Sequence, residues 1–285
     1  MSFGKVEVLA PAGRVSDIVP LLENGADAVY VGLSGYSARP KSSDFLEDEI
    51  IGILPAVHDA GKKLYVAVNA NIPSEKTESL CAAVSALDES GIDALIVSEH
   101  GLMRRLMKHT QNAAIHASTL TGIYNHEEVR MLQELGVKRI ILSSDLFVDE
   151  IVDIIDKVPD MEYEIVADGG ICFNSNRQCL LPHYGEGGRY TVFCQNDYEL
   201  LEDGTALKRA KRIGNYPGKI HRTMGIYLGM GIQSFKVEGR TNDFDYILKR
   251  VKDMVESREF YLAHRAEIPG MMHYIRRNLW FGEQK

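Results

Sequence analysis

Three of the four cysteines in this 285-residue chain lie close together in the sequence, at Cys172, Cys179 and Cys194. Thiolate sulfur is a soft ligand that favours iron–sulfur clusters and zinc. The C-x6-C-x14-C spacing contains no short C-x2-C pair, so three ordinary thiols remain an alternative. Cys81 stands in the apolar segment 79–84, where we expect a small buried residue without a ligand role.

Polar side chains that can do chemistry follow several of the apolar strands that the sequence predicts. The set consists of Asn69, Glu99, His100, His116, Ser118, Ser144, Asp145, Asp168, Glu238 and Arg240. Glu238 and Arg240 share one face if their strand continues that far. A carboxylate and a guanidinium placed in this way can clamp a polar or anionic ligand. A salt bridge that closes the rim of the fold is the alternative.

A repeated unit predicts the elements that position these residues. Four times a helix-like segment ends at a glycine, two residues follow, and an apolar strand begins, at Gly25, Gly91, Gly136 and Gly231. Such near-continuous apolar strands are typical of a parallel sheet covered on both faces. Strands expected near residues 6, 28, 64, 94, 114, 139, 162 and 234 make eight β–α units, which predict a (β/α)8 barrel. An open doubly wound sheet is the alternative, but its glycine-rich loop is missing after the first strand.

One connection, from residue 168 to residue 231, is much longer than the others and holds the three clustered cysteines. Barrel active sites lie at the carboxyl ends of the strands, in such loops. A loop of this length is expected to have an order of its own. The sequence therefore predicts a barrel over 1–260 that includes a cysteine-bearing insertion at 168–231. A C-terminal tail, 261–285, is expected to pack on the barrel.

The composition is that of an ordinary globular protein, with 45% hydrophobic and 25% charged residues. No apolar stretch approaches the roughly 20 residues of a membrane helix, so we expect a soluble, cytoplasmic protein without a membrane span. The net charge, 32 − 40 = −8, argues against a nucleic-acid-binding surface over the whole molecule and favours a small-molecule substrate. The basic run at 208–212 is interpreted as solvated surface, with an anionic ligand nearby as the alternative.

The assembled segments resemble peptidase family U32, the collagenase-like peptidases, from about residue 6 to residue 261. The segments that carry the resemblance are 9–13 (LAPAG), 25–32 (GADAVYVG), 115–119 (IHAST), 164–169 with Cys172 and Cys179, and 234–240 (SFKVEGR). The resemblance implies a [4Fe–4S] protein, since relatives with four cysteines hold such a cluster. Several of them support oxygen-independent hydroxylation of ubiquinone precursors or of bases in transfer and ribosomal RNA, with prephenate implicated as an oxygen source in the RNA cases.

The resemblance assigns Cys172, Cys179 and Cys194 to the metal, but the family's fourth cysteine is missing. Residues 218–221 read GKIH at the corresponding place. His221 or Asp168 is the candidate replacement. Otherwise one iron stays open to substrate or water, or no cluster forms, and zinc is the alternative metal.

Three functions compete at this point. The first is an iron–sulfur enzyme that hydroxylates a small aromatic, isoprenoid or nucleobase substrate, positioned by Glu238, Arg240, His116 and Asn69. The second is a metal-dependent peptidase, as the family name states, with Asp168 or Glu238 as the base. The third is a non-catalytic subunit in an oligomer with a complete family member, which the missing cysteine motivates.

Overall fold

The computed structural model describes residues 6–38, 44–171, 197–202, 205–211, 216–219, 223–240 and 242–269. Eight parallel strands form a closed barrel, because β1 pairs with both its sequence neighbour and the last barrel strand. In order around the barrel they are β1 (Glu7–Pro11), β2 (Ala28–Leu33), β4 (Lys63–Val68), β5 (Ala94–Val97), β6 (Ala114–Ala117), β7 (Arg139–Ile141), β8 (Glu162–Ile171) and β12 (Ser234–Val237). The predicted (β/α)8 barrel is confirmed.

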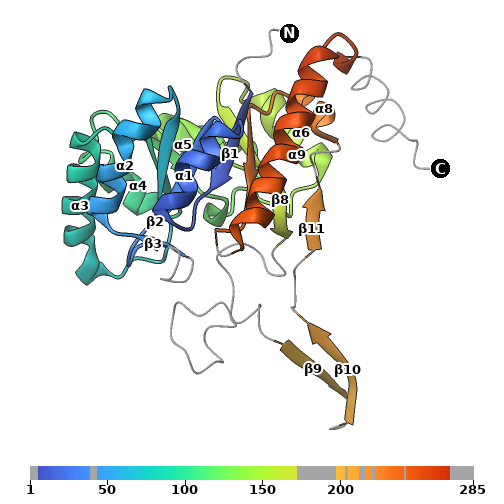
Figure 1. The fold of residues 1–285 in the computed structure, drawn as a ribbon, viewed down its shortest axis with the longest axis horizontal. Coiled ribbons are helices and arrows are strands. Elements are labelled where there is room, and N and C mark those ends of the chain that lie inside the picture. Colours follow the sequence, from blue (N-terminus) through green and yellow to red (C-terminus); the bar gives the residue numbers. More distant parts are fainter. Residues whose placement is uncertain are drawn as a thin grey trace.

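Helices surround the barrel and connect successive strands (Figure 1). They are α1 (Val15–Glu23), α2 (Glu47–Asp59), α3 (Thr77–Glu89), α4 (His100–Leu106), α5 (His126–Leu135), α6 (Val148–Lys157), α8 (Met224–Met230) and α9 (Phe244–Ala263). Two short 3-10 turns, at Ser74–Lys76 and Thr119–Thr121, lie on the connections after β4 and β6. Gly136 and Gly231 end α5 and α8 in the left-handed conformation, with φ of 108° and 105°. The helix-ending role that the sequence predicts for these glycines is thus confirmed.

Two apolar layers result from the alternation of side chains along the strands. Val29 and Val31 of β2 point outward and join the large core between the strands and the helices. Ala28 and Tyr30 of the same strand point inward, into a smaller cluster enclosed by the barrel. The outer layer holds branched residues, whereas the inner layer is rich in alanine. The alanines leave room inside the barrel for long polar side chains.

The insertion begins as a direct continuation of β8, which runs four residues past Ala167, to Ile171. Strand β11 (Tyr216–Lys219) pairs antiparallel with residues 168–171. Strands β9 (Asp197–Glu202) and β10 (Thr205–Lys211) form a separate hairpin, drawn below the barrel in Figure 1. The four metal candidates Cys172, Cys179, Cys194 and His221 lie outside the described residues.

Helix α9 continues through residue 260, where we placed the end of the barrel, and crosses the outside of the barrel to its N-terminal end (Figure 1). Ile268 beyond it is buried against the core. Residues 270–285 of the tail lie outside the described residues. Within the described ranges, no helix is long and apolar enough to span a membrane.

Candidate functional site

The carboxyl ends of the strands hold a buried cluster around Arg240. Its Nη2 donates to Ser37 Oγ at 2.7 Å, and its Nη1 lies 3.6 Å from Asp44 Oδ1. Asp44 belongs to β3 (Asp44–Phe45), a two-residue strand that pairs with the end of β2. Burial raises the pKa of the Asp44 carboxyl, against the opposing effects of Arg240 and of a hydrogen bond from Ser37. Arg240 thus closes the rim of the barrel between its last and its second strand.

This close approach requires a glycine on β2. A Cβ atom at Gly32 would lie 1.9 Å from Arg240 Nη1 and 2.3 Å from Asp44 Oδ1. Strand β12 ends at Val237, and Gly239 turns the chain with φ of 122°. Arg240 therefore reaches the rim through a turn rather than along a continued strand, and there it pairs with Asp44. The structure thus shows an ion pair of Arg240 at the rim, and a role of Glu238 and Arg240 in binding a ligand stays a prediction.

Below Arg240, the buried Lys236 forms the next level of the barrel interior. Its Nζ lies 4.0 Å from the centre of the Tyr30 ring and 3.5 Å from Glu164 Oε1. Burial lowers the pKa of the Lys236 ammonium, while the charges of Glu164 and Glu238 oppose that shift. Arg240 stands 5.6 Å from the same Tyr30 ring. Lys236 and Arg240 thus both face the Tyr30 ring from the end of β12. The charge of Glu238 acts on Lys236, whose pKa it raises.

Asn69 joins three neighbouring strand ends at the same rim. Its Oδ1 accepts from Ala38 N at 3.1 Å, and its Nδ2 lies 3.5 Å from Ser118 Oγ. Ser98 Oγ donates to the backbone oxygen of Asn69 at 3.1 Å. The predicted grouping of polar residues at the ends of β4, β5 and β6 is therefore observed. Through these hydrogen bonds, Asn69 links the loops that follow β2, β4, β5 and β6.

Asp168 faces a different direction from the other rim residues. Its Oδ2 accepts from Arg250 Nη1 of α9 at 2.8 Å, and its side chain is only 3% exposed. The backbone oxygen of Asp168 accepts from Glu238 N at 2.7 Å. The carboxylate is thus engaged with the helix layer outside the barrel, which argues against the predicted role as a general base or metal ligand.

His116 lies within β6, not after it, and it points into the barrel. Its ring meets that of Tyr65 edge to face at 5.0 Å. Burial lowers the pKa of His116 far below its usual range, and the charges of Arg139, Lys236 and Lys63 lower it further. The imidazole is therefore neutral at pH 7. Its Nδ1 is buried without a hydrogen-bond partner among the described residues.

A network of charged residues fills the lower part of the barrel, toward the amino ends of the strands. Arg139 of β7 donates to Glu7 of β1 at 2.5 Å and to Glu164 of β8 at 3.1 Å. Ser234 Oγ lies 2.9 Å from Glu7 and 3.2 Å from Glu164, and Tyr65 donates to Glu7 at 2.7 Å. Burial raises the pKa of Glu7, but the charge of Arg139 and the hydrogen bonds from Arg139, Tyr65 and Ser234 together hold the pKa below its usual value.

This network was not predicted, although the sequence carries a signal for it. Glu7 and Arg139 begin the otherwise apolar strands β1 and β7, and Lys236 lies within β12. Glu164 lies within β8, between Tyr163 and Ile165. In a barrel whose strands are covered by helices, such a charge is expected to point inward and to need a partner. The network joins the site through Glu164, which contacts both Arg139 below and Lys236 above.

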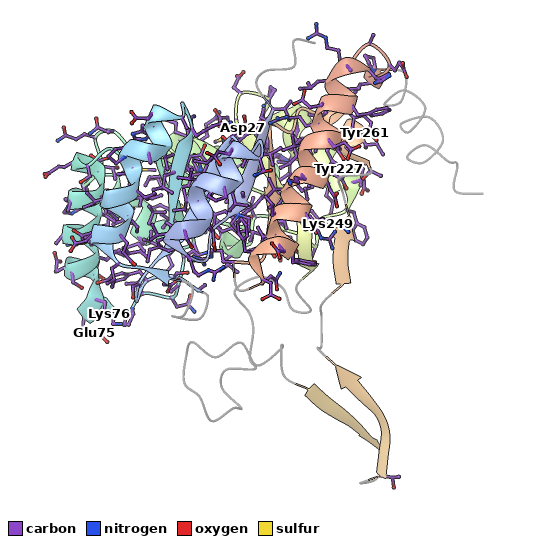
Figure 2. The ribbon with its side chains drawn as sticks, in the orientation of Figure 1. Asp27, Glu75, Lys76, Tyr227, Lys249 and Tyr261 are labelled. Carbon is purple, nitrogen blue, oxygen red and sulfur yellow. The ribbon has the colours of Figure 1, made fainter. Side chains whose placement is uncertain are left out.

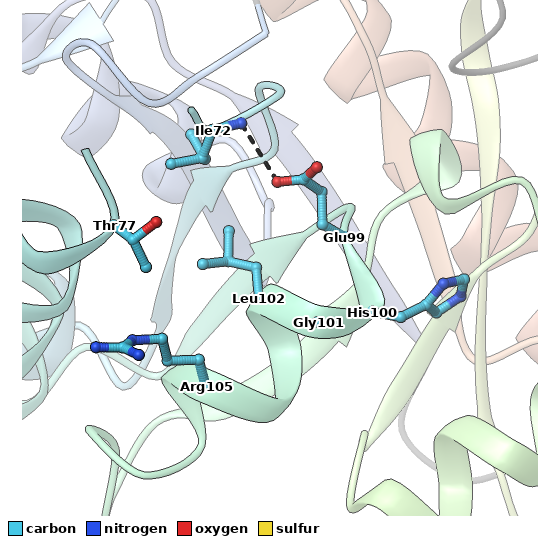
Figure 3. A pocket seen from close by; sticks show the side chains of 7 residues that line it. All are labelled: Ile72, Thr77, Glu99, His100, Gly101, Leu102 and Arg105. Atoms are coloured by element: carbon cyan, nitrogen blue, oxygen red, sulfur yellow. Dashed lines mark hydrogen bonds between the residues drawn. The ribbon is translucent and has the colours of Figure 1, made fainter. Parts of the chain in front are cut away.

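A shallow pocket lies on the outer side of the rim, where α4 follows β5 (Figure 3). Glu99 borders it, and its Oε2 accepts from Ile72 N at 3.3 Å. Arg105, one turn and a half further along α4, borders it at the other end and also borders a second hollow with Arg104 and Lys108. In the described part of the chain, no three His, Cys, Asp or Glu residues are grouped so that they could hold a metal ion.

Comparisons with known proteins agree with the barrel and define the family. The model of Peptidase family U32 matches residues 13–276. The chain is 28% identical to "tRNA hydroxylation protein P" of Escherichia coli over 94% of this chain and 73% of that protein. It is 34% identical to the protein of the same name from Haemophilus influenzae, over 76% of this chain and 47% of that protein.

A third relative is the "23S rRNA 5-hydroxycytidine C2501 synthase" of Escherichia coli, 29% identical over 87% of this chain but only 38% of the synthase. Among solved structures, the U32 peptidase Mk0906 superposes with a TM-score of 0.55 at 12% identity, over 83% of this chain and 94% of that one. The structural likeness supports the fold. The family model covers nearly the whole chain, and the chain belongs to peptidase family U32.

Proposed function

We propose that this chain is an RNA-hydroxylating enzyme whose substrate nucleotide enters the carboxyl end of the barrel. One observation carries the proposal: the chain matches proteins named for tRNA and rRNA hydroxylation at 28–34% identity over at least three quarters of its length. The chain spans 73%, 47% and 38% of these three relatives, so parts of them have no counterpart here.

The proposal replaces our expectation of a free small aromatic, isoprenoid or nucleobase substrate. The net charge of −8, which argued against nucleic acid as a partner, describes the whole molecule. A negative protein can still carry a local basic surface, because potentials at a surface depend on the nearest charges. The names of the relatives favour nucleotides within RNA as the substrate, and therefore nucleic acid as the partner.

Rim residues supply the contacts that such a substrate requires. Arg240 and Lys236 present positive charge at two levels of the barrel interior, and both lie near the Tyr30 ring. We assign them to the recognition of an anionic or strongly polar group. Asn69 holds the adjoining arc of the rim through its contacts with Ala38 and Ser118. The neutral His116 lies deeper in the barrel, beside Tyr65.

We further propose that Cys172, Cys179 and Cys194 hold a [4Fe–4S] cluster, with zinc as the alternative metal. A set of three thiolates fits either metal, and an iron–sulfur cluster would supply redox chemistry. The cysteines follow β8, whose end at Ile171 stands beyond the barrel rim. The contact of Asp168 with Arg250 favours His221 or an exogenous ligand over Asp168 at the fourth position.

The proposal is tested by deleting the gene and measuring modified nucleosides in digested tRNA and rRNA by mass spectrometry. A hydroxylated nucleoside should disappear and should return on complementation with the wild-type chain. Arg240→Met should fail to restore it. Lys138→Met is the matched control, because it removes an exposed cation before β7, at the opposite end of the barrel. An unchanged set of hydroxylated nucleosides in the deletion strain would overturn the proposal.

The cluster has a separate test in the purified protein. Anaerobic reconstitution should give about four irons and four sulfides per chain, and Cys172→Ser should lose them. If the purified protein contains zinc and no sulfide, zinc is the bound metal and the cluster proposal is overturned. Peptidase activity and a role as a non-catalytic subunit stay predictions, and the described contacts favour neither of them.

A further inference from the structure

Several large apolar side chains stand exposed at the same end of the barrel as the candidate site. Phe147 is 73% exposed, Leu46 is 62% exposed and Tyr124 is 40% exposed. Phe147 follows β7 and precedes α6, and Tyr124 follows β6 and precedes α5. Both therefore lie on loops at the carboxyl ends of the strands, where barrel enzymes bind substrate.

Phe147 occupies a position where an aromatic residue gives the fold no benefit. It is the N-cap of α6 and offers no side-chain hydrogen bond to the first turn of that helix. Ser, Thr, Asp or Asn at an N-cap stabilises a helix by accepting such a bond. Glu150 Oε2 instead accepts from Phe147 N at 2.7 Å, which fixes the backbone that presents the ring. A residue that breaks a local rule and remains exposed indicates a role in function.

Tyr124 is linked to the loop that carries Phe147. Its hydroxyl donates to Asp145 Oδ2 at 2.9 Å, and Asp145 also accepts from Ser143. Asp145 precedes Phe147 by two residues on the loop after β7. Glu128 Oε2 accepts from Tyr124 N at 2.8 Å, as Glu150 does for Phe147. Two aromatic side chains are thus held by similar contacts on adjacent, hydrogen-bonded loops.

The neighbouring unit adds positive charge to this part of the molecule. No Asp or Glu occurs between Glu99 and Glu127, whereas Arg104, Arg105 and Lys108 lie in this stretch and are exposed. All three border the hollow beside α4, which adjoins the pocket that starts at Glu99 on the rim. Strands β5, β6 and β7 pair in this order, so the basic helix and the aromatic loops belong to adjacent units.

We infer that this arc of the barrel, over β5, β6 and β7, binds a single-stranded segment of the RNA substrate. Bases next to the reacting nucleotide stack on Phe147 and Tyr124, and phosphates lie along the basic side of α4. The inference rests on the proposed function. Aromatic side chains on which bases stack, beside a basic surface that follows the backbone, are the arrangement that binds single-stranded nucleic acids. Taking a base out of its stack also costs energy, which stacking on protein rings offsets.

The test measures binding of the anaerobically purified full chain to a fluorescein-labelled, 12-nucleotide single-stranded RNA by fluorescence anisotropy. Phe147→Ala should raise Kd about 5- to 140-fold, since stacking contributes about this much per base. Phe147→Trp should retain wild-type affinity. Phe260→Ala is the matched control: Phe260 is 55% exposed but lies beside Tyr261, which Figure 2 places at the opposite end of the barrel.

The basic helix is tested by salt dependence. Arg105 already donates to Glu78 and to Cys81 Sγ, so Arg104→Gln with Lys108→Gln is the informative double variant. It should lower the slope of log Kd against log salt by about 0.7 for each phosphate contact removed. Phe147→Asn distinguishes loss of RNA binding from loss of folding. It should raise Tm, because Asn supplies an N-cap to α6, and it should still weaken RNA binding.

The outcomes separate this inference from the proposed function. If the wild-type chain binds RNA and Phe147→Ala binds as tightly as Phe260→Ala, the inference is overturned and the proposed function stands. If the wild-type chain binds neither this RNA nor total tRNA, and the nucleosides are also unchanged in the deletion strain, both fail.

Discussion

The charged network inside the barrel makes a prediction about Arg139 that can be worked out from its contacts. Arg139 is 7% exposed in its side chain and pairs with Glu7, Glu162 and Glu164. In Arg139→Met, Glu164 keeps Lys236 as a counter-ion at 3.5 Å. Among the described residues, Glu7 keeps only the hydrogen bonds from Tyr65 and Ser234. The substitution therefore leaves one buried carboxylate without a counter-ion.

A single buried charge without its partner costs about 3–5 kcal/mol. The lost pair with Glu162 adds less than about 1 kcal/mol, because that side chain is 55% exposed. We expect the free energy of unfolding of Arg139→Met to fall by about 3–5 kcal/mol at pH 7, measured by urea denaturation. Arg130→Met is the matched control, since Arg130 is 46% exposed and pairs only with the exposed Glu127 in a contact of this kind.

The stability difference between Arg139→Met and the wild type should depend on pH in a definite direction. In the wild-type chain the pKa of Glu7 is lowered, so its stabilising contribution is present above the unfolded pKa and is lost as pH falls through the folded pKa. Without Arg139, burial raises the pKa of Glu7. The resulting penalty is present at neutral pH and decreases as pH falls through the raised pKa. The stability difference between variant and wild type should therefore be largest near pH 7 and smaller near about pH 4.

Glu7→Gln in the Arg139→Met background removes the unpaired charge and should recover part of the lost stability at pH 7. A loss of less than about 1 kcal/mol in Arg139→Met, similar to that of Arg130→Met, would refute the reasoning. So would a stability difference that grows as the pH is lowered.

Three further predictions concern the rim and its support. Gly32→Ala should displace Arg240 and lower the free energy of unfolding by about 1–3 kcal/mol, measured by thermal unfolding. Gly52→Ala is the control: its Cβ meets no atom within 4 Å, so it should be neutral or stabilising. Equal Tm values for the two variants would contradict the close packing at Gly32. Arg250→Met removes a charged hydrogen bond to the buried Asp168 and should cost about 1.5–3 kcal/mol, against about 0.5 kcal/mol or less for the exposed Lys249→Met. Similar denaturation midpoints for the two variants would be inconsistent with a stabilising Arg250–Asp168 pair. Phe147→Asn should stabilise the chain by about 0.5–2 kcal/mol, and an unchanged Tm would show that the N-cap does not limit α6.

The order of the elements followed from local patterns in the sequence. Each strand is a short apolar run, and each helix-ending glycine stands two residues before the next strand; Gly136 and Gly231 adopt the left-handed conformation that this pattern predicts. These signals are local, because the conformation of a few residues and the burial of one segment produce them. Eight such strands predicted a barrel but left an open sheet as the alternative, and the pairing of β1 with both β2 and β12 shows that the sheet closes.

The site was predictable only in part. The positions of Asn69 and Arg240 at the rim followed from where their strands end. Their partners did not, because strand position alone does not say which element lies opposite. Asp168 pairs with Arg250, 82 residues later in the chain, and Arg240 meets Ser37 across 203 residues. The direction of the Asp168 side chain depends on the irregular register between β8 and β12. No local sequence pattern predicts that irregularity.

The contacts among the charges inside the barrel depend on the closure of the sheet. From local patterns alone, Glu7, Arg139, Glu164 and Ser234 can be placed in apolar or mixed strands. Those patterns did not determine that they meet. Glu7 and Arg139 are 132 residues apart and belong to strands that are not neighbours. They come within hydrogen-bonding distance because the sheet closes on itself and turns their side chains toward a common axis, where a buried charge must find its partner.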